Sequence, residues 1–100
     1  MIKFVTEDEN QLLIIIHKDI NFETVRDLEI QVKNFELPEE IASIKLDLSA
    51  VRFIDSTGVS LMIKWLFPLS KQYPVSIDGA SEPLKNIFRI SKIDQFVTVN

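Results

Sequence analysis

The chain has 100 residues, 46% of them hydrophobic, which predicts one compact domain over residues 1–100 that is too small to enclose a catalytic chamber. Its net charge is −4 and its basic residues are scattered singly, so neither DNA nor RNA is expected as a partner. The sequence contains no Cys, and its longest apolar run, Leu12–Ile16, is far shorter than the roughly 18 residues of a membrane span, so we expect no disulfide, thiolate metal site or transmembrane helix.

The first predicted elements are a β-hairpin and a helix. Apolar runs at Ile2–Val5 and Leu12–His17 flank the polar residues 6–11, a pattern that is typical of two paired strands. Apolar residues then recur at helical spacing, which predicts a helix with Asn21 as its N-cap and Pro38 beyond its end. The apolar stripe of this helix consists of Val25, Leu28, Val32 and Phe35.

Two alternating segments predict strands with one buried face and one solvated face. Every second residue is apolar in Ile44–Leu48, and Val75–Ile77 repeats the pattern. A sheet that is covered by helices on both sides requires apolar residues on both faces of its strands. We therefore expect helices on one face of the sheet only.

The remaining predicted elements are two helices and a last strand. The second helix covers Ser56 to about Phe67 and is ended or kinked by Pro68, which cannot donate to the helical ladder. Ser81 is expected to cap a third, short helix with Pro83 in its first turn, and Phe96–Val99 is expected to form a strand. The predicted fold is α/β, a mixed β-sheet with helices packed mainly on one face and the order β-β-α-β-α-β-α-β.

A hydroxyl-rich turn, Asp55-Ser56-Thr57-Gly58, connects a predicted strand to the second helix. Turns of this kind lie at the edge where open α/β sheets usually place their sites. Ser56 or Thr57 is expected as the N-cap of the helix, and Gly58 keeps the backbone open to approach. A helix start also favours an anion, so Ser56 is either only a cap or a hydroxyl that receives a phosphoryl group.

The strand "KLDLSAVRFID", which leads into "DSTG" and then an apolar helix, resembles the STAS domain of bacterial anti-sigma-factor antagonists. The chain length, the order of the elements and the "DINFET" segment before the first helix extend this resemblance over the whole chain. In that family the Ser that follows the Asp of the turn is the phosphoacceptor. The resemblance therefore implies phosphorylation of Ser56, with Thr57 as a secondary acceptor.

The resemblance also implies a cytoplasmic regulator without a cofactor or a bound metal. Such an antagonist sequesters an anti-sigma factor that is also a serine kinase, which releases the sigma factor. Phosphorylation at Ser56 would switch this binding off, and a metal-dependent Ser/Thr phosphatase would reverse the modification. Catalysis by the domain itself is not expected, because His17 is the only histidine and the turn lacks the G-x-S-x-G pattern of a nucleophile elbow.

The sequence departs from the family's pattern at three places. Ser60 stands where a second Gly is frequent, and Asn21 stands where the loop before the first helix often has an Asp, with Asp19 nearby but out of register. Residues 67–74 replace a turn that is usually Gly-rich. These departures leave open an alternative function, a STAS module that is never phosphorylated and serves as a scaffold or as an accessory subunit of a lipid-transport or signalling complex.

The second helix also suggests a surface for a partner. Val59, Met62, Ile63 and Leu66 share one face at about 100° per residue and should face the core, whereas Leu61 and Trp65 lie on another face. Exposed Leu61 and Trp65 would form an apolar docking patch; otherwise the loop around Pro68 or the third helix covers them. The predicted partner-binding residues are Asn21, Asp55, Ser56, Thr57, Gly58, Leu61 and Trp65.

Overall fold

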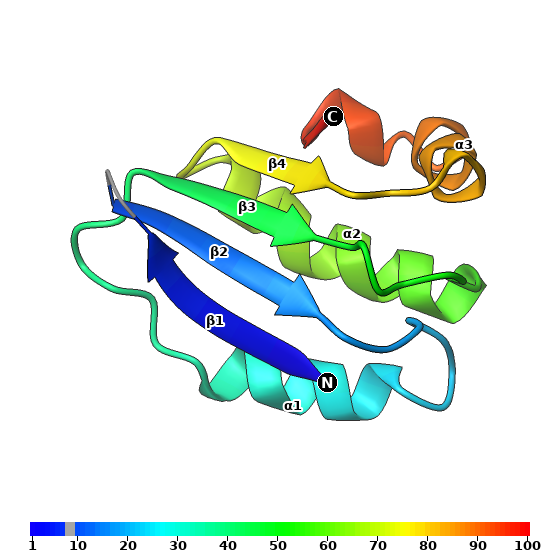
Figure 1. The fold of residues 1–100 in the computed structure, drawn as a ribbon, viewed down its shortest axis with the longest axis horizontal. Helices are drawn as coiled ribbons and strands as arrows, with labels where there is room; N and C mark the ends of the chain where they lie inside the picture. The colour runs from blue at the N-terminus through cyan, green and yellow to red at the C-terminus, as the bar shows by residue number, and fades with distance from the viewer. Residues whose placement is uncertain (8–9) are drawn as a thin grey trace.

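A five-stranded mixed sheet forms the centre of the protein in the computed structural model, which describes residues 1–7 and 10–100 (Figure 1). The strand order is β1-β2-β3-β4-β5; β1 runs antiparallel to β2, and the other neighbours are parallel. The predicted hairpin and the mixed sheet are confirmed, while residues 8 and 9 of its predicted turn lie outside the described residues. The strands are β1 (Ile2–Glu7), β2 (Gln11–Ile16), β3 (Ser43–Asp47), β4 (Val75–Asp78) and β5 (Thr98–Val99).

The core lies on one face of the sheet, as the alternating sequence predicts. Along β2, Leu12, Ile14 and Ile16 are buried, while Leu13 and Ile15 between them point to the opposite face and stay partly exposed. The same alternation runs through β3 and β4. Helices α1 (Val25–Asn34) and α2 (Ser56–Ser70) cover the buried face, because burying that face against them removes apolar surface from water (Figure 1).

The third helix completes the domain beside β4. Helix α3 (Glu82–Ile90) and the short 3₁₀ helix η2 (Ile93–Gln95) precede β5 at the C-terminal side of the sheet (Figure 1). Ser81 caps α3 as predicted, with its hydroxyl oxygen accepting from the Leu84 N–H at 3.4 Å. None of the helices within residues 1–7 and 10–100 is both long and apolar enough to cross a bilayer.

Two predicted boundaries are wrong. Helix α2 does not end before Pro68 but continues to Ser70, because a proline φ suits a helix and the lost N–H removes only one bond of the ladder. The last strand is shorter than Phe96–Val99, because the N–H groups of Phe96 and Val97 both donate to the Ile93 carbonyl at 3.1 Å and close η2.

The prediction that Asn21 is the N-cap of the first helix is also wrong. Thr24 occupies that position, and the Asn21 side chain instead accepts from the Glu23 N–H at 2.9 Å, one turn before α1. Thr24 holds this turn to the chain before it, because its hydroxyl donates to the Asp19 carbonyl at 2.7 Å. The segment before α1 is thus an ordered turn with its own hydrogen bonds.

Candidate functional site

Asp55 is the residue that begins helix α2. Its Oδ1 accepts from the Gly58 N–H at 2.8 Å, so Asp55 is the N-cap, and the prediction that Ser56 or Thr57 is the cap is wrong by one or two residues. An Asp at this position satisfies an orphan N–H and places a negative charge beside the positive end of the helix dipole. The sequence permitted this arrangement, since Asp is as good a cap as Ser.

The second oxygen of Asp55 connects the turn to the loop before α1. Its Oδ2 accepts from the Phe22 N–H at 3.0 Å, and its backbone N–H donates to the Ile20 carbonyl at 3.2 Å. Ile20 also forms an isolated parallel bridge with Ile54. One carboxylate therefore holds two segments together that lie 33 residues apart in the chain.

Asp19 makes a matching connection from the other side. Its Oδ1 accepts from the backbone N–H groups of Arg52 at 2.7 Å and Phe53 at 3.1 Å. Together, Asp19 and Asp55 accept from four backbone N–H groups, three in loops and that of Gly58 in the first turn of α2, which would otherwise need other partners. In the sequence Asp19 lies out of register with the family's Asp, yet in the structure it supports the site.

Gly58 is required because the first turn of α2 passes directly against the backbone of Ile20. A Cβ on Gly58 would lie 2.2 Å from the Ile20 carbonyl oxygen and 2.9 Å from its carbonyl carbon. The close approach is thus toward another segment of this chain. This differs from the expectation that Gly58 leaves the backbone open to a partner, because Gly58 is buried.

Ser56 and Thr57 occupy the exposed first turn of α2. Both residues are exposed, and within residues 1–7 and 10–100 neither hydroxyl has a hydrogen-bond partner in the protein. Thr57 also lines a hollow of about 300 Å³ whose wall includes Arg26 and Lys64. Because Asp55 supplies the cap, the Ser56 hydroxyl is available at the protein surface.

Two aromatic side chains that the sequence analysis did not select lie on the loops beside this turn. Phe22 is 70% exposed and Phe53 is 57% exposed, although a Phe side chain normally gains by burial. Their backbone N–H groups are the ones held by Asp55 and Asp19. A sequence signal existed, since both are Phe residues that fall outside every alternating or helical stripe.

Leu61 and Trp65 do not form an exposed patch. Leu61 is only 8% exposed and Trp65 is half-buried, and both line a hollow between α2 and α1. Of the two predicted covers, the third helix contributes no residue to this hollow, whereas Pro68 lines it as part of α2, and Glu29, Val32 and Lys33 of α1 line the opposite side. The other prediction for α2 holds for Met62 and Leu66, which are fully buried.

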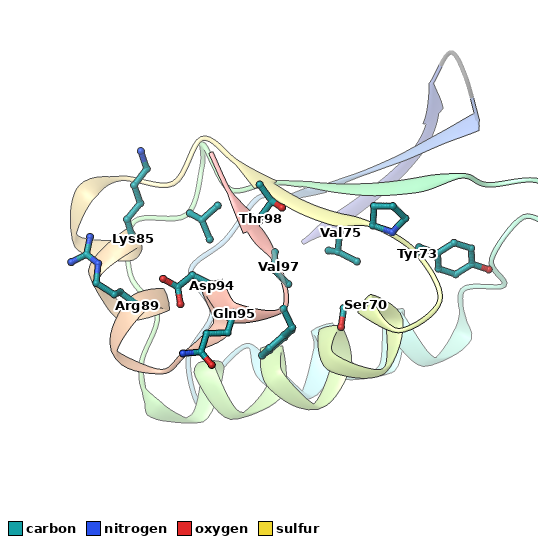
Figure 2. Close-up of a pocket in the computed structure, with 12 residues that line it drawn as sticks. Ser70, Tyr73, Val75, Lys85, Arg89, Asp94, Gln95, Val97 and Thr98 are labelled. Atoms are coloured by element: carbon teal, nitrogen blue, oxygen red, sulfur yellow. The ribbon is translucent and has the colours of Figure 1, made fainter.

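A hollow beside β5 offers no converging chemistry (Figure 2). Its volume is about 610 Å³, and Lys85 and Arg89 on α3 are its basic residues. Lys85 is 3.8 Å from the Glu82 carboxylate, Arg89 donates to the Asn86 side chain at 2.7 Å, and Figure 2 shows their charged ends well apart. Within the part of the chain that the structure describes, His, Asp and Glu side chains nowhere gather in a group of three that could hold a metal ion.

Comparison with known proteins shows one family and one fold. The sequence model of the STAS domain matches residues 3–100. No curated protein matches the chain significantly.

Three solved structures with this fold illustrate the similarity. A Thermotoga maritima protein assigned as an anti-sigma factor antagonist superposes with a TM-score of 0.82 at 19% identity, over 98% of this chain and 84% of the other. The anti-sigma factor antagonist SpoIIAA in its unphosphorylated form gives 0.65 at 13% identity, over 90% of this chain and 83% of the other. The Bacillus cell fate determinant SpoIIAA in its phosphorylated form gives 0.64 at 13% identity, over 100% and 91%.

Proposed function

Because the chain belongs to the STAS domain family, we propose that it is an anti-sigma-factor antagonist, a regulatory binding module that is switched by phosphorylation of Ser56. In its unphosphorylated form it binds and sequesters an anti-sigma factor that is also a serine kinase. Phosphoryl transfer from ATP to the Ser56 Oγ ends this binding, and a Ser/Thr phosphatase restores it. The protein acts in the cytoplasm and has no catalytic activity of its own.

The observation that carries this proposal is the exposed, unengaged hydroxyl of Ser56. Asp55 has taken the capping role, with one carboxylate oxygen on Gly58 and the other on Phe22. A kinase can therefore reach Ser56 and modify it without breaking a hydrogen bond that holds the fold. The positive end of the α2 dipole favours the added phosphate, while the neighbouring Asp55 carboxylate repels it.

The exposed aromatic residues beside the turn support partner binding at the same surface. Phe22 and Phe53 together offer two large, exposed apolar side chains on the loops beside the turn, a composition that suits the centre of a protein interface. Leu61 is no part of this surface because it is buried, and Asn21 contributes through the turn that positions Phe22. The partner would cover Ser56 and pack on the two Phe side chains.

A phosphate on Ser56 would then lie inside the interface without a partner. Burying such a charge unpaired is costly, and a loss of about 4 kcal/mol weakens binding roughly a thousandfold. No refolding of the domain is required, since the Asp55 and Asp19 connections remain in place. Thr57 is a secondary acceptor, and a phosphate there would lie nearer to Arg26, in the hollow that both residues line.

The test is phosphorylation by a candidate serine kinase of the anti-sigma-factor type. The purified protein, the kinase and ATP are incubated, and intact-mass spectrometry is expected to show one added phosphate, which is absent in Ser56→Ala. Thr57→Ala separates the two acceptors, and Ser60→Ala is the matched control on the same exposed side of α2. A phosphate that persists in Ser56→Ala contradicts the assignment of the acceptor.

The affinity of the same kinase for the bare and the phosphorylated protein tests the switch. We expect the thousandfold loss on phosphorylation and about tenfold weaker binding of the bare Phe22→Ala and Phe53→Ala variants. If no phosphate is added but the two Phe variants still weaken binding to a partner, the chain is the unphosphorylated scaffold or accessory subunit. The exposed Phe22 and Phe53 favour that second function as much as the first, because they support binding without regard to phosphorylation.

A further inference from the structure

An apolar hollow separates α1 from α2, at the end of these helices that is remote from Ser56. Its walls include Val32 and Phe35 from the α1 side, Leu61, Trp65 and Leu69 from α2, and Phe4 from β1. The hollow is open to solvent, since Glu29, Lys33 and Lys64 among its lining residues are exposed, and its volume is about 340 Å³. We call it the α1–α2 hollow.

The hollow exists because α1 touches the core with few side chains. Among its ten residues only Leu28 is fully buried, and Val32 is half-buried. Phe35, just beyond the helix, does not fill the gap because its ring stacks on Phe4, with centroids 3.7 Å apart and planes inclined by 6°. The stacked pair forms one rigid apolar wall, and Trp65 forms part of another.

The charged residues that line the hollow carry a net positive charge. Its charged lining residues are Glu29, Lys33 and Lys64. Glu29 and Lys64 approach each other at 3.9 Å and neutralise each other in part, while Lys33 has no carboxylate within ion-pair distance among the described residues. A basic group at an apolar hollow is complementary to an amphipathic anion, in a chain whose net charge is −4.

We propose that the α1–α2 hollow binds a free medium-chain carboxylic acid, with the chain in the apolar interior and the carboxylate at Lys33. A cavity of about 150 Å³ holds a six-carbon ring, so 340 Å³ offers room for roughly a dozen heavy atoms, the size of decanoate. Lys33 would pair with the carboxylate, while the apolar lining residues would contact the aliphatic chain. This site is independent of phosphorylation at Ser56, which lies at the opposite end of α2.

The chain carries its own probe for this ligand. Trp65 is the only Trp of the sequence and lines the hollow, so its fluorescence should shift to shorter wavelength when an apolar chain displaces water beside it. The intact protein is titrated with octanoate, decanoate, dodecanoate and tetradecanoate, each below its micelle concentration. Each buried methylene should tighten binding about fourfold, and the gain should stop near ten to twelve carbons, when the hollow is full.

Two pairs of variants test whether decanoate binds in the hollow and contacts Lys33. Lys33→Glu should weaken decanoate binding about fivefold and leave decan-1-ol unchanged, whereas Lys18→Glu, an exposed Lys outside the hollow, should change neither. Val32→Phe, which narrows the hollow, should abolish binding, while Ile30→Phe on the exposed side of α1 should not. Thermal melting of each variant identifies any that fails to fold, and the charge variants remain informative because they alter exposed residues.

The proposal is overturned by any of three results. Decanoate fails to change the Trp65 fluorescence and gives no heat on calorimetric titration. Affinity continues to rise through tetradecanoate, which indicates unspecific association with apolar chains. The protein cosediments with phosphatidylglycerol vesicles but does not bind free decanoate, which indicates a membrane surface as the true partner.

Discussion

At the scale of the single residue, Asp55 and Gly58 explain why the turn before α2 has the sequence it has. Asp55 makes two side-chain hydrogen bonds to different segments, and Gly58 permits the close contact with Ile20 that these bonds enforce. Ser56 and Thr57 lie between Asp55 and Gly58 in the sequence, and their side chains make no hydrogen bond to residues 1–7 and 10–100. The first and last residues of the turn thus hold the fold, while the two residues between them have exposed hydroxyl groups.

The close contact predicts that Gly58→Ala is destabilising. The new Cβ would meet the backbone of Ile20, which cannot rotate away as a side chain could, and this outweighs the better helix propensity of Ala. We expect the free energy of unfolding to fall by about 2 kcal/mol, measured by urea denaturation. Ser60→Ala, on an exposed position of α2, should change it by less than about 0.5 kcal/mol. Equal stability of Gly58→Ala and the parent would contradict the geometry.

A second residue-scale prediction concerns Asp47 and pH. The hydroxyl of Ser49 donates to the Asp47 Oδ1 at 2.6 Å and its N–H donates at 2.9 Å, and these bonds lower the pKa of Asp47 below its ordinary value of 3.8. A pKa that is lower in the folded state means that folding favours the carboxylate. The resulting stabilisation is fully present above the unfolded value of 3.8 and is lost as the pH falls through the folded pKa.

Ser49→Ala removes the hydroxyl donor, which is the largest cause of the shift. The pKa of Asp47 should therefore rise toward 3.8, and the variant should lose less stability than the parent as the pH falls below that value. The carboxyl ¹³C shift of Asp47, followed by NMR from neutral to acidic pH, measures this directly. An unchanged titration of Asp47 in Ser49→Ala would show that the hydroxyl does not control it.

At the scale of the element, α2 has more than one apolar face, and only the structure distinguishes them. Met62 and Leu66 are buried against the sheet, whereas Leu61 and Trp65 face α1 across the α1–α2 hollow. Phe67 lies on an exposed side, where its ring meets Phe96 edge-on at a centroid distance of 5.2 Å. The helix is therefore apolar over much of its circumference, apart from the side that carries Ser56, Ser60 and Lys64, although only part of its apolar surface is covered.

Adjacent residues of α2 should consequently respond very differently to truncation. Leu66→Ala removes a side chain with no exposed surface and should reduce the free energy of unfolding by about 3 kcal/mol. Phe67→Ala removes a larger side chain that is 44% exposed, and we expect about 1 kcal/mol, mainly from the Phe96 contact. Chemical denaturation of both variants tests the orientation of the helix, and a larger loss for Phe67→Ala would contradict it.

At the scale of the whole molecule, stability is unevenly distributed because the sheet has a protected centre and, at one edge, the two-residue strand β5. Strand β3 is hydrogen-bonded on both sides, to β2 and β4, and contributes Ile44 and Leu46 to the core. Strand β5 consists of Thr98 and Val99 and pairs with β4 on one side. Opening of β5 exposes little apolar surface, so it should not require global unfolding.

Amide hydrogen exchange should reproduce this gradient. The Leu46 N–H in β3 is expected to exchange at least about a hundredfold more slowly than the Asn100 N–H, which donates to the Ile77 carbonyl at 2.9 Å, since Leu46 needs nearly complete unfolding and Asn100 only local opening. Exchange followed by NMR in deuterated buffer at neutral pH gives both rates in one sample. Similar protection of the two amides would mean that the edge and the centre of the sheet unfold together.

The sequence by itself determined the element types, their order and the one-sided sheet, because strand alternation, helical spacing and the Ser81 cap depend on residues that are close along the chain. It also directed attention to the Asp55–Gly58 turn. Only the tertiary structure decided that Asp55 is the cap, that Gly58 serves the contact with Ile20, and that Leu61 is buried. These features arise from a loop that crosses the turn 33 residues away in sequence, and the burial of a helix face depends on which element packs against it. Phe22 and Phe53 fall outside every alternating or helical stripe, which indicates exposure, but no local pattern records the long-range contacts that place them beside this turn.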